Sequence, residues 1–191
     1  MTLIDDYEQA EDKAAFCARL DAEDAERDAR LRAPGALAAA ALWYVGQGLR
    51  VFPCEVRGKR PLGALARNGC NSATADADQV AAWWQTEPQA NIGIACGHLV
   101  DVVDIDGPPG YAAIADHWQA LLDVSLGLVH TGTGGAHIYV TADPRSRNGA
   151  SRWGAGVDTR ALGGYVIAPP SVHPNGRLYT WTRPLSVEAA A

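Results

Sequence analysis

The sequence contains no Cys-x-x-Cys pair, and its four cysteines are scattered along 191 residues. This spacing argues against a cysteine-based zinc knuckle and against a disulfide framework, and it fits a reducing compartment. No basic segment followed by an apolar run opens the chain, and no run approaches the roughly 18 apolar residues that span a bilayer. We therefore expect a cytoplasmic protein with no signal peptide and no membrane partner.

An overall excess of positive charge is also missing, because the formal net charge is −6. Residues 1–32 hold ten acidic and five basic residues, whereas the remainder holds twelve acidic and eleven basic residues. The acidity therefore belongs to the N-terminal segment, and the nearly neutral body can still carry a local basic groove. We expect an acidic helical appendage over residues 1–32 and one folded domain over residues 33–191.

Helical and strand-like segments alternate irregularly along that domain. Helices are expected over 35–48, after a cap at Thr74 or Asp76, and after Pro108. We count about seven strand-like segments, from "RVFPC" at 50–54 to "LYTWT" at 178–182. Strands mixed with three or four helices predict an α+β fold around a mainly antiparallel sheet.

The segment "VVDIDG" at 102–107 places two aspartates inside an apolar run. Because side chains alternate along a strand, Asp104 and Asp106 share one face, where their charges repel. A shared proton, a basic neighbour or a metal ion must compensate for this repulsion. The alternative is that the strand ends here and that Asp106 caps the helix at Pro108.

The segment "TGTGGAHIYV" at 131–140 combines a glycine turn with a strand that carries His137. Gly134 and Gly135 allow a backbone turn to approach a ligand closely, and their N–H groups can receive phosphate oxygens. The simpler alternative is a glycine hairpin followed by a histidine whose hydrogen bonds are satisfied within the protein. No Gly-Lys-Ser/Thr sequence is present, so this is not a Walker P-loop.

A third segment, "GVDTRALGGYVIAPPSVHPNG" at 156–176, carries Asp158 and Arg160 two residues apart. Its "APPSVH" part presents Ser171 and His173 on a proline turn. Taken alone, Asp158 can be an ordinary turn residue.

Together these segments predict a metal-dependent site for a triphosphate. Asp104, Asp106 and Asp158 supply three hard oxygen ligands, which favour Mg²⁺ or Mn²⁺. Two such ions can activate an attacking oxygen and stabilise a leaving one. His137 is a candidate triphosphate contact, and the candidate phosphate-binding charges are Lys59, Arg60 and Arg160.

Eight segments in order resemble the bifunctional DNA primase/polymerase N-terminal (Prim-Pol) domain of the archaeo-eukaryotic primase superfamily. The resemblance covers most of residues 36–184. The segments are "WYVGQGLRVFP", "GKRPL", "ATADADQVAAWW", "PQANIGIACG", "VVDIDG", "TGTGGAHIYV", "GVDTRALGGYVIAPPSVHPNG" and "YTW". The three catalytic motifs of the family fall on Asp104/Asp106, on Gly135-Ala136-His137 and on Asp158.

The resemblance implies an RRM-like catalytic sheet with flanking helices and a smaller N-terminal αβ unit. It implies template-directed joining of nucleotides to a 3′-hydroxyl, in plasmid, phage or mobile-element replication. Asp104, Asp106 and Asp158 then hold the metals and His137 contacts the triphosphate. Further phosphate or nucleotide contacts fall on Arg160, Ser171 and His173. The implied partners are a DNA template and primer, nucleoside triphosphates, and a replicative helicase acting in trans.

Two other classes of function fit parts of the sequence. One is a catalytically silent nucleic-acid-binding module of a replication initiator, and the other is a metal-dependent nuclease. A further hypothesis concerns the loop at 143–156, which holds Arg145, Arg147, Arg152 and Trp153. We expect this loop to grip the template or primer, with Arg57, Lys59 and Arg60 as the alternative path.

Overall fold

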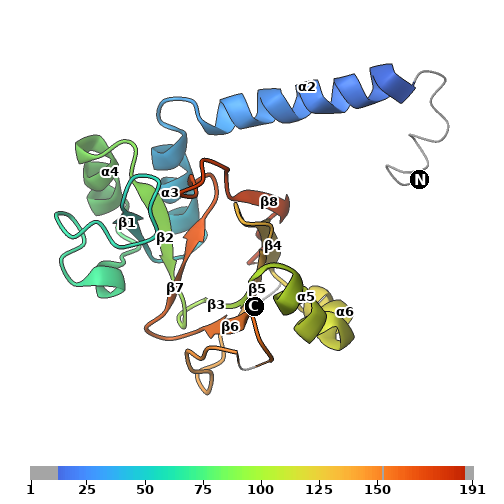
Figure 1. Ribbon diagram of the computed structural model, residues 1–191. Coiled ribbons are helices and arrows are strands. Elements are labelled where there is room, and N and C mark those ends of the chain that lie inside the picture. The colour runs from blue at the N-terminus through green and yellow to red at the C-terminus, as the bar shows by residue number, and fades with distance from the viewer. Residues whose placement is uncertain (1–12, 152, 188–191) are drawn as a thin grey trace.

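The structure is a computed structural model that describes residues 13–151 and 153–187. It has two antiparallel sheets with helices packed against them (Figure 1), which confirms the predicted α+β class. Helix α2 (Lys13–Leu31), which lies within the expected appendage, extends away from this body, and residues 32–35 join it to α3 (Ala36–Gly46). The part of the expected appendage before residue 13 lies outside the described residues.

The smaller sheet contains β1 (Val51–Cys54), β2 (Asn91–Ala95) and β7 (Tyr165–Ala168), with β2 in the centre. Helix α4 (Ala77–Thr86) packs beside α3 and begins at Asp76, whose carboxylate accepts hydrogen bonds from two backbone N–H groups. The capping prediction is therefore confirmed. The expected smaller unit is therefore not made of N-terminal segments alone. Strand β7, from late in the chain, pairs with the edge of β2 that β1 leaves free.

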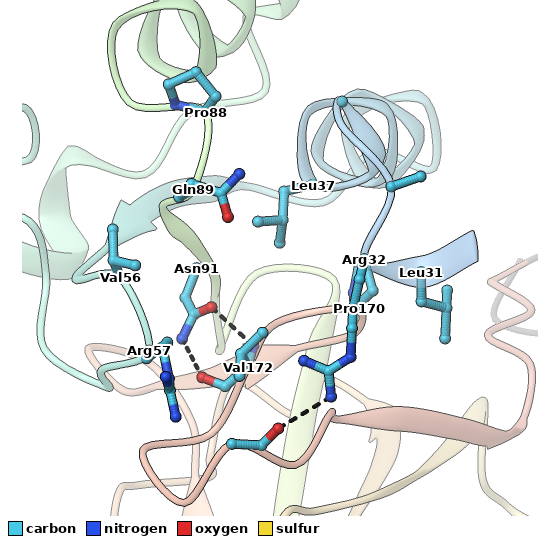
Figure 2. A pocket seen from close by; sticks show the side chains of 13 residues that line it. Leu31, Arg32, Leu37, Val56, Arg57, Pro88, Gln89, Asn91, Pro170 and Val172 are labelled. Atoms are coloured by element: carbon cyan, nitrogen blue, oxygen red, sulfur yellow. Dashed lines mark hydrogen bonds between the residues drawn. The ribbon is translucent and has the colours of Figure 1, made fainter. Parts of the chain in front are cut away.

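Asn91 ties this small sheet to two neighbouring loops. Its side chain donates to the carbonyl of Gly58. It also donates to the carbonyl of Val172 and accepts from the N–H of Val172 (Figure 2). Because Asn91 is buried, these bonds satisfy polar atoms that would otherwise destabilise the fold. The loop after β1 and the turn after β7 are thereby held on either side of β2.

The larger sheet has the strand order β6-β3-β5-β4-β8, with every neighbouring pair antiparallel. Its strands are β3 (Val100–Ile105), β4 (Gly127–His130), β5 (Ala136–Thr141), β6 (Val157–Arg160) and β8 (Thr180–Arg183). Strand β5 lies between β3 and β4, which are joined through α5 (Gly107–Ile114) and α6 (Trp118–Asp123). This is a split βαβ unit, as the predicted RRM-like sheet requires.

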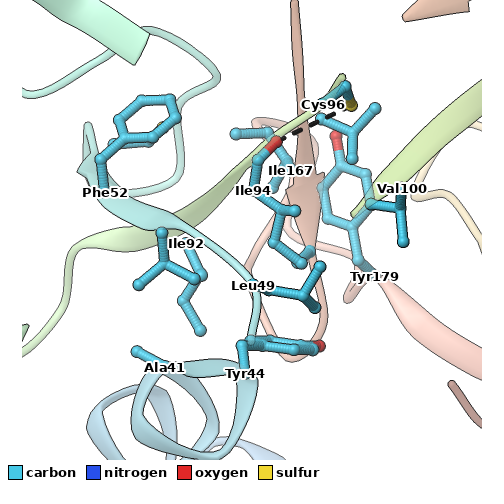
Figure 3. Packing of buried hydrophobic residues seen from close by; sticks show 14 of the residues in the cluster. Ala41, Tyr44, Leu49, Phe52, Ile92, Ile94, Cys96, Val100, Ile167 and Tyr179 are labelled. Carbon is cyan, nitrogen blue, oxygen red and sulfur yellow. Dashed lines mark hydrogen bonds between the residues drawn. The ribbon is translucent and has the colours of Figure 1, made fainter. Parts of the chain in front are cut away.

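Two clusters of buried side chains follow from the alternation along β3. Val103 and Ile105 face α5 and α6 and pack with Ile138. Val100 and Val102 face the other way and join a larger core shared with the small sheet. Figure 3 shows that core, in which Ile92 and Ile94 of β2 lie among Tyr44, Leu49 and Tyr179.

The expected helix after Pro108 is interrupted. A 3₁₀ turn (Ala115–His117) separates α5 from α6, so the apolar stripe from Tyr111 to Leu122 runs over two short helices. A short 3₁₀ turn (Gly69–Ser72) also lies in the loop between β1 and α4. Among the described residues, no helix has the length and apolar character needed to cross a membrane.

Candidate active site

The register of the large sheet brings three predicted residues to one face. Asp104 on β3 lies directly opposite His137 on β5 and directly opposite Asp158 on β6. Directly opposed residues of antiparallel strands point their side chains to the same face. His137 and Asp158, which lie 33 and 54 positions after Asp104 in the sequence, therefore meet it across adjacent strands.

Arg160 compensates for the repulsion between two of the carboxylates. Its Nη2 atom lies 3.1 Å from Asp104 Oδ2 and 2.9 Å from Asp158 Oδ2, and its Nε atom lies 3.3 Å from Asp104 Oδ2. The other oxygen of Asp158 accepts a hydrogen bond from the Ser151 N–H. A basic neighbour, one of the three compensations that the sequence left open, is therefore present for Asp104 and Asp158.

Asp106 lies at the end of β3 and is exposed. It occupies the N-cap position of α5, but its side chain accepts no capping hydrogen bond. Partial burial raises the pKa of the Asp106 carboxyl, the charge of Asp104 raises it further, and Lys59 lowers it. The carboxylate therefore stands at the position of a cap without acting as one, and remains available to a ligand.

His137 is buried beside Asp104, with Nε2 3.4 Å from Asp104 Oδ1. Burial lowers the pKa of His137 to about 4, which outweighs the opposing effect of Asp104, while Lys59 and Arg160 lower the pKa further. The imidazole is therefore neutral at pH 7. Its Nδ1 atom is buried and has no hydrogen-bond partner in the described structure, so the satisfied-histidine alternative does not describe it.

Four of these groups, but not Asp158, open into one cavity of about 410 Å³, which is within the usual size of small-ligand sites. It lies between the Asp104 face of the large sheet and β7 of the small sheet. The predicted residues that line it are Lys59, Asp104, Asp106, His137 and Arg160. The other lining residues are Thr131, Thr133, Asn148, Gly163, Gly164, Tyr165, Val166, Ile167 and Tyr179.

A comparison with known protein families identifies the family to which the residues around this cavity belong. The family described as bifunctional DNA primase/polymerase, N-terminal, matches residues 41–191, which include every residue that lines the cavity. The chain belongs to this Prim-Pol family. A comparison with curated proteins gives no match. Family membership implies primase/polymerase activity in general, with DNA and nucleotides as substrates.

The glycine turn of this Prim-Pol domain differs in detail from the expectation. The N–H groups of Gly134 and Gly135 donate within the turn, to the carbonyl and the hydroxyl of Thr131. They are therefore not free to receive a phosphate. The hydroxyls of Thr131 and Thr133 lie 3.2 Å apart at the cavity wall and offer polar contacts instead.

The glycines have a separate structural purpose. A Cβ atom at Gly135 would lie 2.2 Å from the carbonyl oxygen of Ile105, and Gly134 has a φ of +82°. Only glycine allows β5 to begin this close to β3 and allows the turn its left-handed residue. The turn therefore positions His137 against Asp104.

Ser171 and His173 are not brought into the cavity of the Prim-Pol domain. Ser171 is fully buried, and its hydroxyl accepts a hydrogen bond from the N–H of Ile92. His173 is buried against Tyr179, and its Nδ1 accepts from the N–H of Asn175. In this structure both residues hold the turn after β7 to the rest of the fold and do not line the cavity.

Two threonines and a tyrosine were missed by the sequence analysis. Thr131 and Thr133 flank a glycine in "TGTGG", so their hydroxyls were available as a signal beside the predicted turn. Tyr179 gives no such signal, because it reads as an ordinary core position. Its ring lies 5.8 Å from the His137 ring, and burial raises its pKa, so its phenol is neutral at pH 7.

The carboxylates suit a divalent cation in their chemistry but are arranged around Arg160 in this structure. Among the described residues, no three His, Cys, Asp or Glu side chains converge closely enough to form a metal-binding group. Asp104 and Asp158 nevertheless direct oxygens at one point, where Arg160 now lies. Carboxylate oxygens are the ligands that Mg²⁺ and Mn²⁺ prefer, so the donor set fits such an ion.

The arginine loop at 143–156 is less cationic than expected. Arg145 forms a 2.8 Å ion pair with Asp143, so the charge of Arg145 is offset within the loop itself. Arg147 donates to the carbonyls of Pro144 and Ser146, and Arg152 lies outside the described residues. Trp153 is 42% exposed and contacts the ring of His117. Template binding by this loop stays a prediction.

Proposed function

We propose that this Prim-Pol domain joins nucleotides to the 3′-hydroxyl of a primer on a DNA template. The observation that carries the proposal is that Asp104, Asp106, His137 and Arg160 line one cavity, while Asp158 lies directly opposite Asp104 and binds the same guanidinium of Arg160. In the reaction, the 3′-hydroxyl of the primer releases its proton to solvent, its oxygen bonds to the α-phosphorus of a nucleoside triphosphate, and the bond from that phosphorus to the leaving pyrophosphate breaks. Both events place negative charge where this site gathers cationic and hydrogen-bonding groups.

In this proposal the residues of the site have two roles, which are to hold divalent cations and to position the triphosphate. Asp104, Asp106 and Asp158 would hold one or two divalent cations, Mg²⁺ or Mn²⁺. Such cations, when bound, activate the attacking oxygen and neutralise the leaving group. Because Arg160 lies between two of these carboxylates, Arg160 and a cation compete for the same oxygens.

The cationic and neutral side chains would orient the triphosphate. Lys59 lines the cavity, and its charge acts on both Asp106 and His137. Neutral His137 can donate one hydrogen bond to a phosphate oxygen without adding charge to the site. Most of the rate enhancement would then come from alignment and charge neutralisation.

One assay separates this function from the two alternatives. The protein is incubated with labelled deoxynucleotides or ribonucleotides, a primed DNA template and Mn²⁺. Extension of the primer supports the proposal, whereas degradation of the DNA indicates a nuclease. Binding without either reaction indicates a silent module. A requirement for a helicase in trans stays a prediction, which addition of a replicative helicase to the same reaction tests.

A further inference from the structure

A second cavity, of about 270 Å³, has a different lining from the cavity at Asp104 and His137, which we call the catalytic cavity (Figure 2). The end of α2, the loop after β1 and the turn at 169–176 form its walls. Apolar side chains of Leu37, Val56, Pro88 and Val172 line one part. Arg32 and Arg57 line another part, and we call this cavity the arginine pocket.

The two guanidinium groups of the arginine pocket converge on one residue, Gly176. Arg32 Nη2 donates to the Gly176 carbonyl at 3.0 Å. Arg57 Nη2 lies 3.2 Å from the position that a Cβ atom on Gly176 would take. Two like charges held beside a single residue repel each other, so an anion between them would be stabilised.

The protein itself supplies little negative charge to this pair. Within the described residues, the guanidinium of Arg57 makes no hydrogen bond and no ion pair. Arg32 pairs with Asp28, but at the long distance of 3.9 Å. Arg57 also has a φ of +52°, a conformation that is costly for a residue with a side chain. The backbone thus holds an unpaired cation at the wall of a cavity.

The arginine pocket is physically connected to the catalytic cavity. Asn175, next to Gly176, donates to the carbonyl of Gly132 at 2.7 Å, and Gly132 belongs to the turn that carries Thr131 and Thr133. On the other side, Arg57 and Lys59 are two residues apart on one loop, and Lys59 lines the catalytic cavity.

We propose that the arginine pocket binds a backbone phosphate of the DNA strand that leaves the catalytic cavity. The phosphate lies between Arg32 and Arg57, and the attached sugar or base rests on the apolar wall at Val56 and Pro88. Phosphate contacts of this kind position a strand without reading its sequence. This assignment rests on the proposed function, because it takes the catalytic cavity as the place where the strand begins.

The test measures DNA binding by fluorescence anisotropy in EDTA and without nucleotide, across a range of salt concentrations. Arg57→Ala is compared with Arg67→Ala, which removes the same charge from an exposed position outside both cavities. We expect Arg57→Ala to weaken binding of single-stranded and primed DNA about tenfold. The salt dependence should lose about one unit of log–log slope. Arg57→Lys should recover part of the affinity, and thermal melts verify that each variant is folded.

Several outcomes would overturn the assignment. One is equal loss of affinity in Arg57→Ala and Arg67→Ala, which would indicate only general charge attraction. Another is that Arg57→Ala weakens binding of a deoxynucleotide or of inorganic phosphate as much as it weakens DNA binding. A third is DNA affinity in Arg57→Ala equal to that of the parent. If the parent binds DNA through Arg57 and yet incorporates no nucleotide, the pocket assignment stands and the proposed function fails.

Discussion

Arg160 gives the sharpest test of the electrostatic account, because it holds two carboxylates that would otherwise face each other across β3 and β6. The variant is Arg160→Ala, measured first in EDTA. Hydrogen bonds to charged groups contribute about 1.5–3 kcal/mol each. The Arg160 side chain is 38% exposed, so solvent screening reduces its total contribution.

We therefore expect Arg160→Ala to lower the free energy of unfolding of the metal-free protein by about 2 kcal/mol. For a chain of this length, that loss corresponds to a melting temperature lower by roughly 4–8 °C. Part of this loss comes from the repulsion between the directly opposed carboxylates of Asp104 and Asp158, which Arg160 no longer offsets in the variant. Thermal unfolding followed by circular dichroism measures the shift.

Adding Mn²⁺ should reverse the effect. A cation that binds the folded protein raises its stability according to its concentration and affinity. Without Arg160 as a competitor, Mn²⁺ should bind more tightly, and it should raise the melting temperature of Arg160→Ala more than that of the parent. Arg147→Ala is the matched control, since Arg147 donates hydrogen bonds to carbonyls of its own loop and to no carboxylate among the described residues. Unchanged stability of Arg160→Ala in EDTA, or a smaller response to Mn²⁺ than the parent shows, would refute the reasoning.

Two further predictions concern the glycine turn and the histidine behind it. His137→Ala should raise the KM for nucleotide or lower kcat, which steady-state incorporation measures. The affinity for primed DNA, measured by fluorescence anisotropy, should stay unchanged. Equal loss of nucleotide use and DNA binding would make His137 part of the scaffold. Gly135→Ala should cost about 2–3 kcal/mol of stability and disturb incorporation, because the new Cβ would lie 2.2 Å from the Ile105 carbonyl. Gly134→Ala, which meets open space at a positive φ, should cost about 1 kcal/mol, and similar losses in the two variants by chemical denaturation would contradict the close approach of β3 and β5.

The sequence predicts local features well where a single segment decides them. Asp76 caps α4, and Val80, Trp83 and Trp84 are buried on one face of that helix, as the i, i+3, i+4 spacing indicates. The strands that carry Asp104 and His137 are also where the alternation places them. These features depend on neighbours in sequence, which a local pattern contains.

Features that depend on pairing across the fold were not predictable in the same way. Arg160 was expected to contact phosphate, but the β3–β6 register places its guanidinium between Asp104 and Asp158. Ser171 was expected near a nucleotide, but it is buried where its hydroxyl satisfies a backbone donor of β2. The arginine pocket depends on Arg32 and Arg57 meeting at Gly176, and nothing in the spacing of these residues indicates that contact.

The central claim is that the carboxylates of this cavity exist to support nucleotide transfer, and Asp106 tests it most directly. Its carboxylate receives no capping hydrogen bond in the structure, so Asp106→Asn removes charge with little cost to the fold. Primer extension with Mn²⁺ should fall about a hundredfold or more, with the melting temperature and DNA affinity of the parent retained. Incorporation by Asp106→Asn at the rate of the parent would contradict the account.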